Sequence, residues 1–136
     1  MFFAPMGERA FMPDVGSDFR ADVEKLSDGA VVVAVHGEAD LYSAPELRDR
    51  LAVVIDGGAS RLLVDLSDAS FIDSMALGVL LGSTKRLRAS GGQLELVVSK
   101  PDIRRIFEIT MLDRILVIHP SREIALELGD RGAETV

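Results

Sequence analysis

The side chains that could do chemistry in this chain are carboxylates, hydroxyls and two histidines, because none of the 136 residues is a cysteine. That absence excludes disulfides, thiolate metal sites and cysteine nucleophiles. His36 and His119 are far apart in the sequence, so a zinc site would need carboxylates gathered from several loops. No GxSxG, HExxH or Walker-type phosphate loop occurs, and GVLLGSTK at 78–85 has the wrong spacing and lies inside a predicted helix. We therefore expect no metal, no cofactor and no catalytic activity.

The strongest functional signal is FIDSMALGVLLG at residues 71–82. Asp73 and Ser74 begin a predicted helix, where the first backbone N–H groups are unpaired and the helix dipole is positive. Either side chain could serve only as an N-cap, worth ~1 kcal/mol. Ser74, Gly78 and Gly82 are spaced four apart, however, and share a helix face that is almost without side chains. Two glycines cost a helix roughly 2 kcal/mol relative to alanine. We therefore expect another backbone to approach this face closely, either the protein's own sheet or a second protein.

A second group of polar residues indicates a different chemistry. Three carboxylates and a lysine lie at or after the ends of predicted strands: Asp65, Asp68, Asp73 and Lys100. A phospho-acceptor receiver domain uses strand-end acids with a magnesium ion and a lysine after a late strand. It also needs an acidic pair that closes the first parallel strand, and Glu38 and Asp40 would point to opposite sides if that strand continued. Asp65 and Asp68 are better explained as solvated loop acids, and an aspartate-phosphorylated receiver domain is a remote alternative.

The elements that must position these residues follow from hydrophobic periodicity and turn residues. Strands are predicted at 19–23, 30–36, 61–66, 93–99 and 114–119. Helices are predicted at 43–56, at 74–90, after Pro101, and from Ser121 to near Gly129. The turn Ser27-Asp28-Gly29 joins the first two strands into a hairpin, and residues 67–72 are predicted to be a loop.

The start of the first helix carries its own signal. Ser43 and Glu46 have the spacing of a capping box, with Pro45 in the first turn. Strands and helices alternate after the hairpin, which predicts the α/β class: a single domain with a mostly parallel or mixed sheet of four to five strands and helices packed on it. A functional site is expected in the loops at the carboxyl ends of the strands.

Composition and charge describe one soluble globular domain, with 48% hydrophobic and 27% charged residues. The formal net charge of −7 argues against a direct nucleic-acid partner. The longest apolar runs are shorter than the ~20 residues that span a bilayer, and Glu8 and Arg9 interrupt any signal peptide. We therefore expect a cytoplasmic protein with no membrane contact. Its parts would be a flexible N-terminal arm at 1–17, the domain at 18–129 and an acidic tail at 130–136.

The motif and its surroundings resemble a known family. FIDSMALGVLLG, preceded by VVVAVHGEADLYSAPELRDRL and followed by GGQLELVVSKPDIRRIFEITMLDRILVIHPSREIAL, is similar to the anti-anti-sigma factors, which antagonise anti-sigma factors and are built on a STAS domain. The resemblance covers about residues 19–128. It implies that an anti-sigma factor with serine kinase activity phosphorylates Ser74, and that the Gly-Glu-x-Asp pattern at 37–40 brings Asp40 near Ser74. The family usually reads Asp-Ser-Ser-Gly-Leu-Gly, whereas this chain has Met75 and Ala76 for the second serine and first glycine.

The resemblance implies a function by partner switching. The unphosphorylated chain would bind its anti-sigma factor, phosphorylation of Ser74 would release it, and a serine phosphatase would reverse the modification, so that sigma-factor-dependent transcription is regulated. The expected partner-binding residues are Asp40, Asp73, Ser74, Met75, Gly78 and Gly82. One alternative is a STAS module that is never phosphorylated and serves as a scaffold in a transporter or a signalling assembly.

Overall fold

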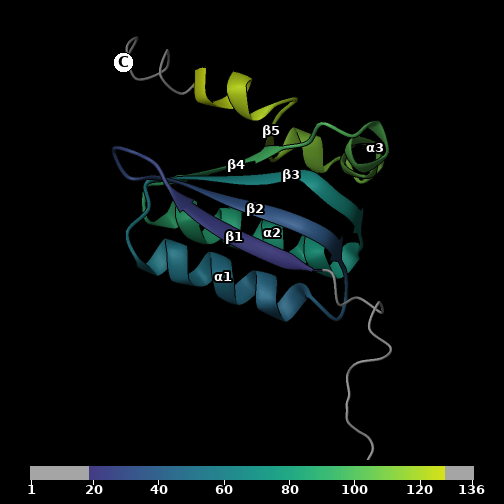
Figure 1. The fold of residues 1–136 in the computed structure, drawn as a ribbon, viewed down its shortest axis with the longest axis horizontal. Coiled ribbons are helices and arrows are strands. Elements are labelled where there is room, and N and C mark those ends of the chain that lie inside the picture. Colours follow the sequence, from purple (N-terminus) through teal and green to yellow (C-terminus); the bar gives the residue numbers. More distant parts are fainter. Residues whose placement is uncertain (1–18, 128–136) are drawn as a thin grey trace, which may run out of the picture.

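A five-stranded sheet, with its strands in the spatial order β1-β2-β3-β4-β5, forms the centre of the molecule (Figure 1). The computed structural model describes residues 19–127, so the expected arm at 1–17 and tail at 130–136 lie outside the described residues. The strands are β1 (Arg20–Lys25), β2 (Ala30–Ala39), β3 (Arg61–Ile72), β4 (Gln93–Val97) and β5 (Val117–His119). β1 and β2 are antiparallel, and the remaining neighbours are parallel. The α/β prediction, with an initial hairpin and a mixed sheet, is confirmed.

The hairpin turn explains the sharp reversal between β1 and β2. Asp28 and Gly29 have φ values of 61° and 80°, and the amide of Ala30 bonds the carbonyl of Ser27 at 3.3 Å. Two consecutive residues with positive φ make the turn type whose twist matches that of paired strands. The edge strand β1, which precedes the turn, exposes the charged side chains of Arg20, Asp22 and Glu24.

Helices cover the two faces of the sheet differently. α1 (Ala44–Asp56) and α2 (Ser74–Ala89) lie side by side on one face, whereas the helical residues 122–127 lie across the other (Figure 1). The short helix α3 (Pro101–Ile109) contributes Ile103 and Phe107 to the main core. Among residues 19–127, no helix combines the length and the apolar character needed to cross a membrane.

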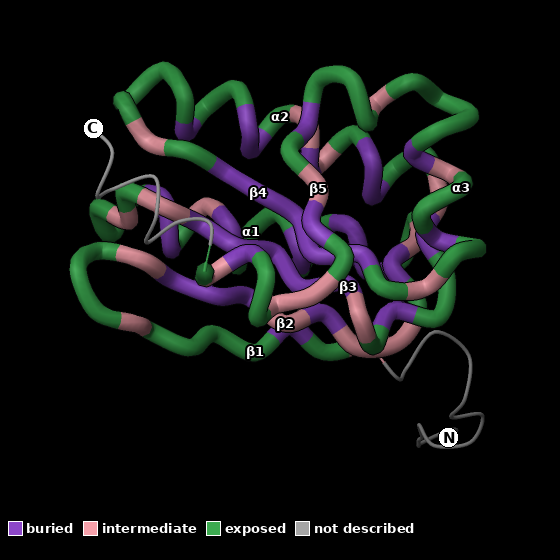
Figure 2. Tube along the Cα trace, turned by 90° about the horizontal axis from the view of Figure 1, so that it is seen from above, coloured by how far each residue is buried: buried purple, intermediate pink, exposed green. Residues whose placement is uncertain are grey.

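Strand residues alternate between two apolar cores. Val31, Val33 and Val35 of β2 join the large core under α1 and α2, while Val32 joins a smaller core that Ala125 of the C-terminal helix covers. This period of two is the ordinary consequence of the pleat. Figure 2 shows the buried residues running along the central strands and on the inner sides of the helices. Because both faces are covered, the strand reads as a continuous apolar run.

The loop predicted at 67–72 is wrong, because β3 continues to Ile72. Its last residues pair with the end of β2, with Ala39 opposite Ile72, after register shifts between Ala34 and His36 and between Gly37 and Glu38. Ala69 and Ile72 point into the core. The polar residues that suggested a loop are the exposed or partly exposed residues of a strand.

The last predicted strand is also shorter than expected. Only Val117–His119 pairs with β4, and the preceding residues Leu112–Arg114 form a single 3₁₀ turn after Met111. Met111 has a φ of 61°, which reverses the chain at the end of α3. Glycine or asparagine usually occupies such a position and marks it in the sequence. Because methionine occupies it here, this turn was not predicted.

A buried ionic cluster joins β3, β4, β5 and the C-terminal helix. Glu95 Oε1 lies 2.7 Å from Arg61 Nη2 and 2.8 Å from His119 Nε2, and the same guanidinium nitrogen donates to the carbonyl of Ala125 at 2.7 Å. Burial on its own would raise the pKa of Glu95. Hydrogen bonds from Arg61 and His119 outweigh that effect, so the pKa of the Glu95 carboxyl is lowered from 4.5.

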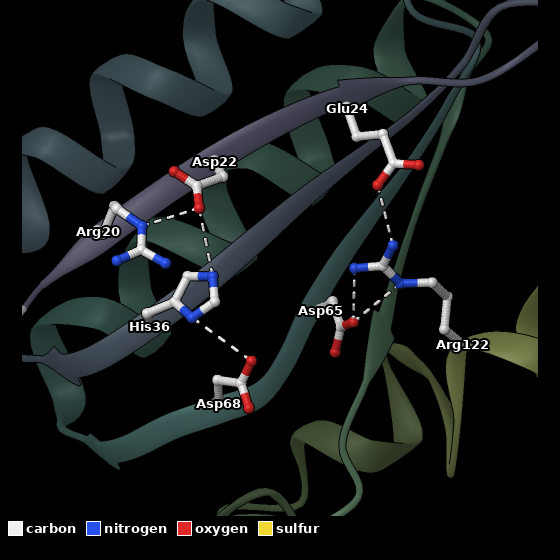
Figure 3. A network of polar contacts seen from close by, with 7 residues as sticks. All are labelled: Arg20, Asp22, Glu24, His36, Asp65, Asp68 and Arg122. Atoms are coloured by element: carbon white, nitrogen blue, oxygen red, sulfur yellow. Dashed lines mark hydrogen bonds and ion pairs between the residues drawn. The ribbon is translucent and has the colours of Figure 1, made fainter.

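A second arginine, Arg122 of the C-terminal helix, pairs with carboxylates of β1 and β3. Arg122 Nη2 lies 3.0 Å from Asp65 Oδ2 on β3, and Arg122 Nη1 lies 3.0 Å from Glu24 Oε1 on β1 (Figure 3). Asp65 itself is buried. The interpretation of Asp65 as a solvated loop acid is therefore wrong, because it lies within a strand and has a fixed cationic partner.

We expect Glu95→Gln to destabilise the fold by about 2 kcal/mol at neutral pH, because it removes the charge that Arg61 and His119 bond. A carboxyl with a lowered pKa stabilises the fold above its unfolded value of 4.5 and loses that contribution as the pH falls through its folded value. The deficit should therefore shrink below pH 4.5. Urea unfolding over this range measures it, with the exposed Glu123→Gln as control. A deficit that does not change with pH would contradict the assignment.

Candidate functional site

Asp73 organises the start of α2. It is the N-cap, and its Oδ1 accepts hydrogen bonds from the amides of Met75 at 3.0 Å and Ala76 at 3.1 Å. Its Oδ2 accepts from the amide of Leu41 at 2.9 Å, and its own amide donates to Ala39 at 3.1 Å. One carboxylate thus caps the helix and fixes the loop between β2 and α1 beside it.

Ser74 is left free by this arrangement. It is the first residue of α2, it is exposed, and its hydroxyl has no hydrogen-bond partner within the part of the chain that the structure describes. Asp73 satisfies the cap that the serine could otherwise have provided. The hydroxyl is therefore open to solvent and to an incoming reagent.

The small-residue face of α2 points away from the sheet. Gly78 and Gly82 are exposed, and a Cβ built on either would have no other atom within 4 Å beyond the helix's own backbone and the adjacent residues. Ala76, Leu77 and Leu80 occupy the opposite, buried side. Of the two explanations for these glycines, close packing against the protein's own sheet is thereby excluded.

Asp40 lies in the loop that Asp73 holds, but its carboxylate serves the other helix. Asp40 Oδ1 accepts from the amides of Tyr42 at 3.0 Å and Ser43 at 3.1 Å, at the start of α1. Ser43 Oγ donates to the carbonyl of Glu38 at 2.7 Å and forms no cap with Glu46. The predicted capping box is wrong, because Ser43 already has helical backbone angles and its hydroxyl turns back toward β2.

Exposed apolar residues occur in the segments next to Ser74. Four large hydrophobic residues near it each expose between 47% and 80% of their surface: Leu41, Tyr42, Phe71 and Met75. They come from the β2–α1 loop, the end of β3 and the first turn of α2, which follow the carboxyl ends of β2 and β3. We call these four residues with Ser74 the Ser74 surface. Exposed apolar groups gathered in this way are typical of a protein-binding site.

Sequence reasoning found only Met75 of the four apolar residues. Leu41 and Tyr42 lie in a short loop between a predicted strand and a predicted helix. Two large hydrophobic residues in such a loop could have indicated an exposed apolar site. Phe71 was hidden because residues 67–72 were predicted to be a loop, whereas its place in β3 beside Glu38 sets its direction.

A groove of about 420 Å³ runs from the Ser74 surface between α1 and α2. Ser74, Gly78 and Gly82 line it from α2, and Arg48 and Ala52 line it from α1. The α2 side of the groove combines small residues with Met75, Val79 and Arg86.

The acidic residues that suggested a receiver domain do not converge. Asp65 pairs with Arg122, Asp68 Oδ2 lies 3.4 Å from His36 Nδ1, and Asp73 caps α2. Lys100 Nζ donates to the carbonyl of Ala69 at 3.1 Å. Within residues 19–127 no three His, Cys, Asp or Glu side chains are placed to hold a metal ion.

The two histidines also have local partners. His36 lies within β2, where its Nε2 is 3.4 Å from Asp22 Oδ2 and its other ring nitrogen faces Asp68 (Figure 3). His119 ends β5 and is buried against Glu95. Both are ordinary sheet residues with carboxylate neighbours.

Fold and surface together define a single-domain α/β protein that presents an exposed serine on a surface suited to another protein. The STAS domain family model matches residues 22–125, and the chain belongs to this family. It is 37% identical over 99 residues to the anti-sigma-B factor antagonist of Bacillus subtilis, covering 73% of this chain and 90% of that one. The Staphylococcus aureus protein of the same name is 33% identical over 92 residues, covering 68% and 85%.

A solved structure gives the same result. The crystal structure of an anti-sigma factor antagonist from Mycobacterium paratuberculosis superposes with a TM-score of 0.75 at 31% identity. The match covers 81% of this chain and 92% of that one. Sequence and fold thus point to the same group of proteins.

We expect Gly82→Ala to stabilise the protein by about 1 kcal/mol, because alanine favours helix and the added methyl group meets open space. Thermal or urea unfolding measures the change. Gly92→Ala is the control with the opposite sign, since its Cβ would lie 2.7 Å from Leu87 Cδ1 and 2.9 Å from the Ser60 carbonyl oxygen. A destabilised Gly82→Ala chain would show that this helix face is not open.

Proposed function

We propose that this chain is an anti-sigma factor antagonist and that phosphorylation of Ser74 controls its binding to an anti-sigma factor. The observation that carries the proposal is the unbonded, exposed Ser74 hydroxyl, which lies next in sequence to Met75 and beside the loop that carries the exposed Leu41. The names of the relatives, which match over most of their length, support the same function. The proposed contact residues are Asp40, Asp73, Ser74, Met75, Gly78 and Gly82.

A phosphoryl group on Ser74 would change the surface more than the fold. It adds about −1.5 to −2 charge and three acceptor oxygens. The N-terminus of α2 tolerates an anion within the monomer, because the helix dipole favours negative charge there. At the interface the same group adds bulk and charge between apolar residues and next to Asp73, whose carboxylate is already fully engaged.

The free energy needed for switching is moderate. Moving a population from 1:99 to 99:1 takes about 5.5 kcal/mol of differential affinity. A dianion desolvated at the centre of an apolar contact without a partner charge is a sufficient source of that difference. No rearrangement of the strands or helices is required.

The remaining participants follow from this mechanism. The anti-sigma factor is a serine kinase, and any nucleotide binds to that kinase. A serine phosphatase restores the unphosphorylated chain, which binds the anti-sigma factor. The chain itself is a substrate and a binder and catalyses no reaction. It acts in the cytoplasm, where sigma factors meet RNA polymerase.

A second candidate rests on Met75, which stands where the family usually has a second serine. Its exposed side chain enlarges the apolar area directly beside the hydroxyl. A STAS module that binds permanently and is never phosphorylated would gain from that area. Such a scaffold would keep its partner in the presence of ATP.

The test compares capture of proteins from the native host by the wild-type chain and by Ser74 variants. Ser74→Glu should fail to retain an anti-sigma factor that wild type and Ser74→Ala retain. Ser90→Glu is the matched control, since that serine lies at the opposite end of α2 and is also exposed. Retention by Ser74→Glu equal to wild type would refute the proposal.

Phosphorylation is tested with the captured partner once it has been purified. Intact-mass measurement after incubation with ATP should show one added phosphoryl group on wild type and none on Ser74→Ala. The modification should survive acid, as phosphoserine does. An unchanged wild-type mass with full partner binding would favour the scaffold, and a base-labile phosphoryl group that requires magnesium would favour the receiver domain.

A further inference from the structure

The groove between α1 and α2 has a shape that the Ser74 surface alone does not explain. It continues from Ser74 along two further turns of α2, past Gly78 to Gly82, and Ala52 faces it from α1. These residues are small, and Met75 and Val79 of α2 also border the groove. The space is left open within the part of the chain that the structure describes.

Two neighbouring helices with a row of small residues between them form a groove into which a third helix can pack. Side chains four residues apart form ridges on a helix, and such a ridge packs into a groove between neighbouring rows. Ser74, Gly78 and Gly82 form a row of that spacing on α2. An amphipathic helix lying in a groove is a recurring mode of recognition between proteins.

The charges in the groove indicate what the occupant carries. Although the chain has a net charge of −7, the charged residues that line the groove are both arginines. Arg86 is paired with Asp56 of α1. Arg48 is exposed, and its guanidinium has no ion-pair partner among residues 19–127.

We propose that the groove binds a helical segment of the anti-sigma partner that places an Asp or Glu side chain against Arg48. The inference rests on the proposed function and adds to it the chemistry of the partner's contact segment. Continuity of the groove with the Ser74 surface means that one partner can cover both. The acidic side chain sets register and speeds encounter, while the small residues let the two backbones approach.

Charge reversal tests the role of Arg48. The probe is the anti-sigma factor that wild type captures and Ser74→Glu does not, purified after identification by mass spectrometry. Arg48→Glu should lower its affinity by about tenfold, and raising the salt concentration should shrink the difference from wild type. Arg50→Glu makes the same change of formal charge on the same exposed helix but outside the groove. It should change affinity by less than about twofold.

The outcomes separate this inference from the proposed function. Equal effects of Arg48→Glu and Arg50→Glu, with binding still lost in Ser74→Glu, would overturn the groove inference and leave the proposed function intact. Binding by Ser74→Glu at wild-type strength would overturn the proposed function itself. Unfolding curves that match wild type show that both arginine variants are folded.

A cross-linking experiment identifies the occupant directly. Because the chain has no cysteine, Ala52→Cys introduces one thiol in the groove for a short photo-cross-linker. It should capture a partner peptide that carries Asp or Glu within a helix, and Val53→Cys, exposed on the same helix outside this groove, should not. Equal capture from both positions, or a peptide without an acidic residue, would overturn the inference.

Discussion

The hydrogen bonds of one carboxylate determine what this surface can do. Asp73 closes the first turn of α2 and holds the β2–α1 loop through the Leu41 amide. Because the aspartate provides the cap, the next side chain is not required for the helix. Ser74 is therefore free to be modified without loss of the helix start. The same bonds hold Leu41 in place beside it, while Asp40 accepts from the amide of Tyr42, so a hydroxyl and exposed apolar residues are presented together.

The sheet supplies the rigidity that this arrangement needs. Apolar cores on both faces, the Glu95 cluster and the Arg122 contacts tie the C-terminal helix to the strands. A change of charge on Ser74 then acts on a fixed surface. The exposed glycines of α2 reduce the helix's own stability by roughly 1 kcal/mol each, and burial of the neighbouring Leu77 and Leu80 offsets that loss.

Much of the fold could be predicted because the sequence signals were local. The run AVVVAV predicted a buried strand, and Ser27-Asp28-Gly29 predicted the hairpin turn before it. Residues 67–72 were misread because strand pairing with β2, set by distant residues, overrides their polar character. Ser43 matched a capping box by spacing, yet its hydroxyl bonds Glu38 instead. The Ser74 surface was only partly predicted, because Phe71 and the two loop residues Leu41 and Tyr42 join it through tertiary contacts.

The two edges of the sheet differ from the surface around Ser74 in the contacts they permit. β1 borders the sheet with alternating charged side chains, and β5 offers only three residues of backbone at the other border. Neither invites a foreign strand, since a short or charged border is a poor template for aggregation and fibril growth. A protein that binds its partner through the surface around Ser74 benefits from sheet borders that disfavour pairing with further copies of itself.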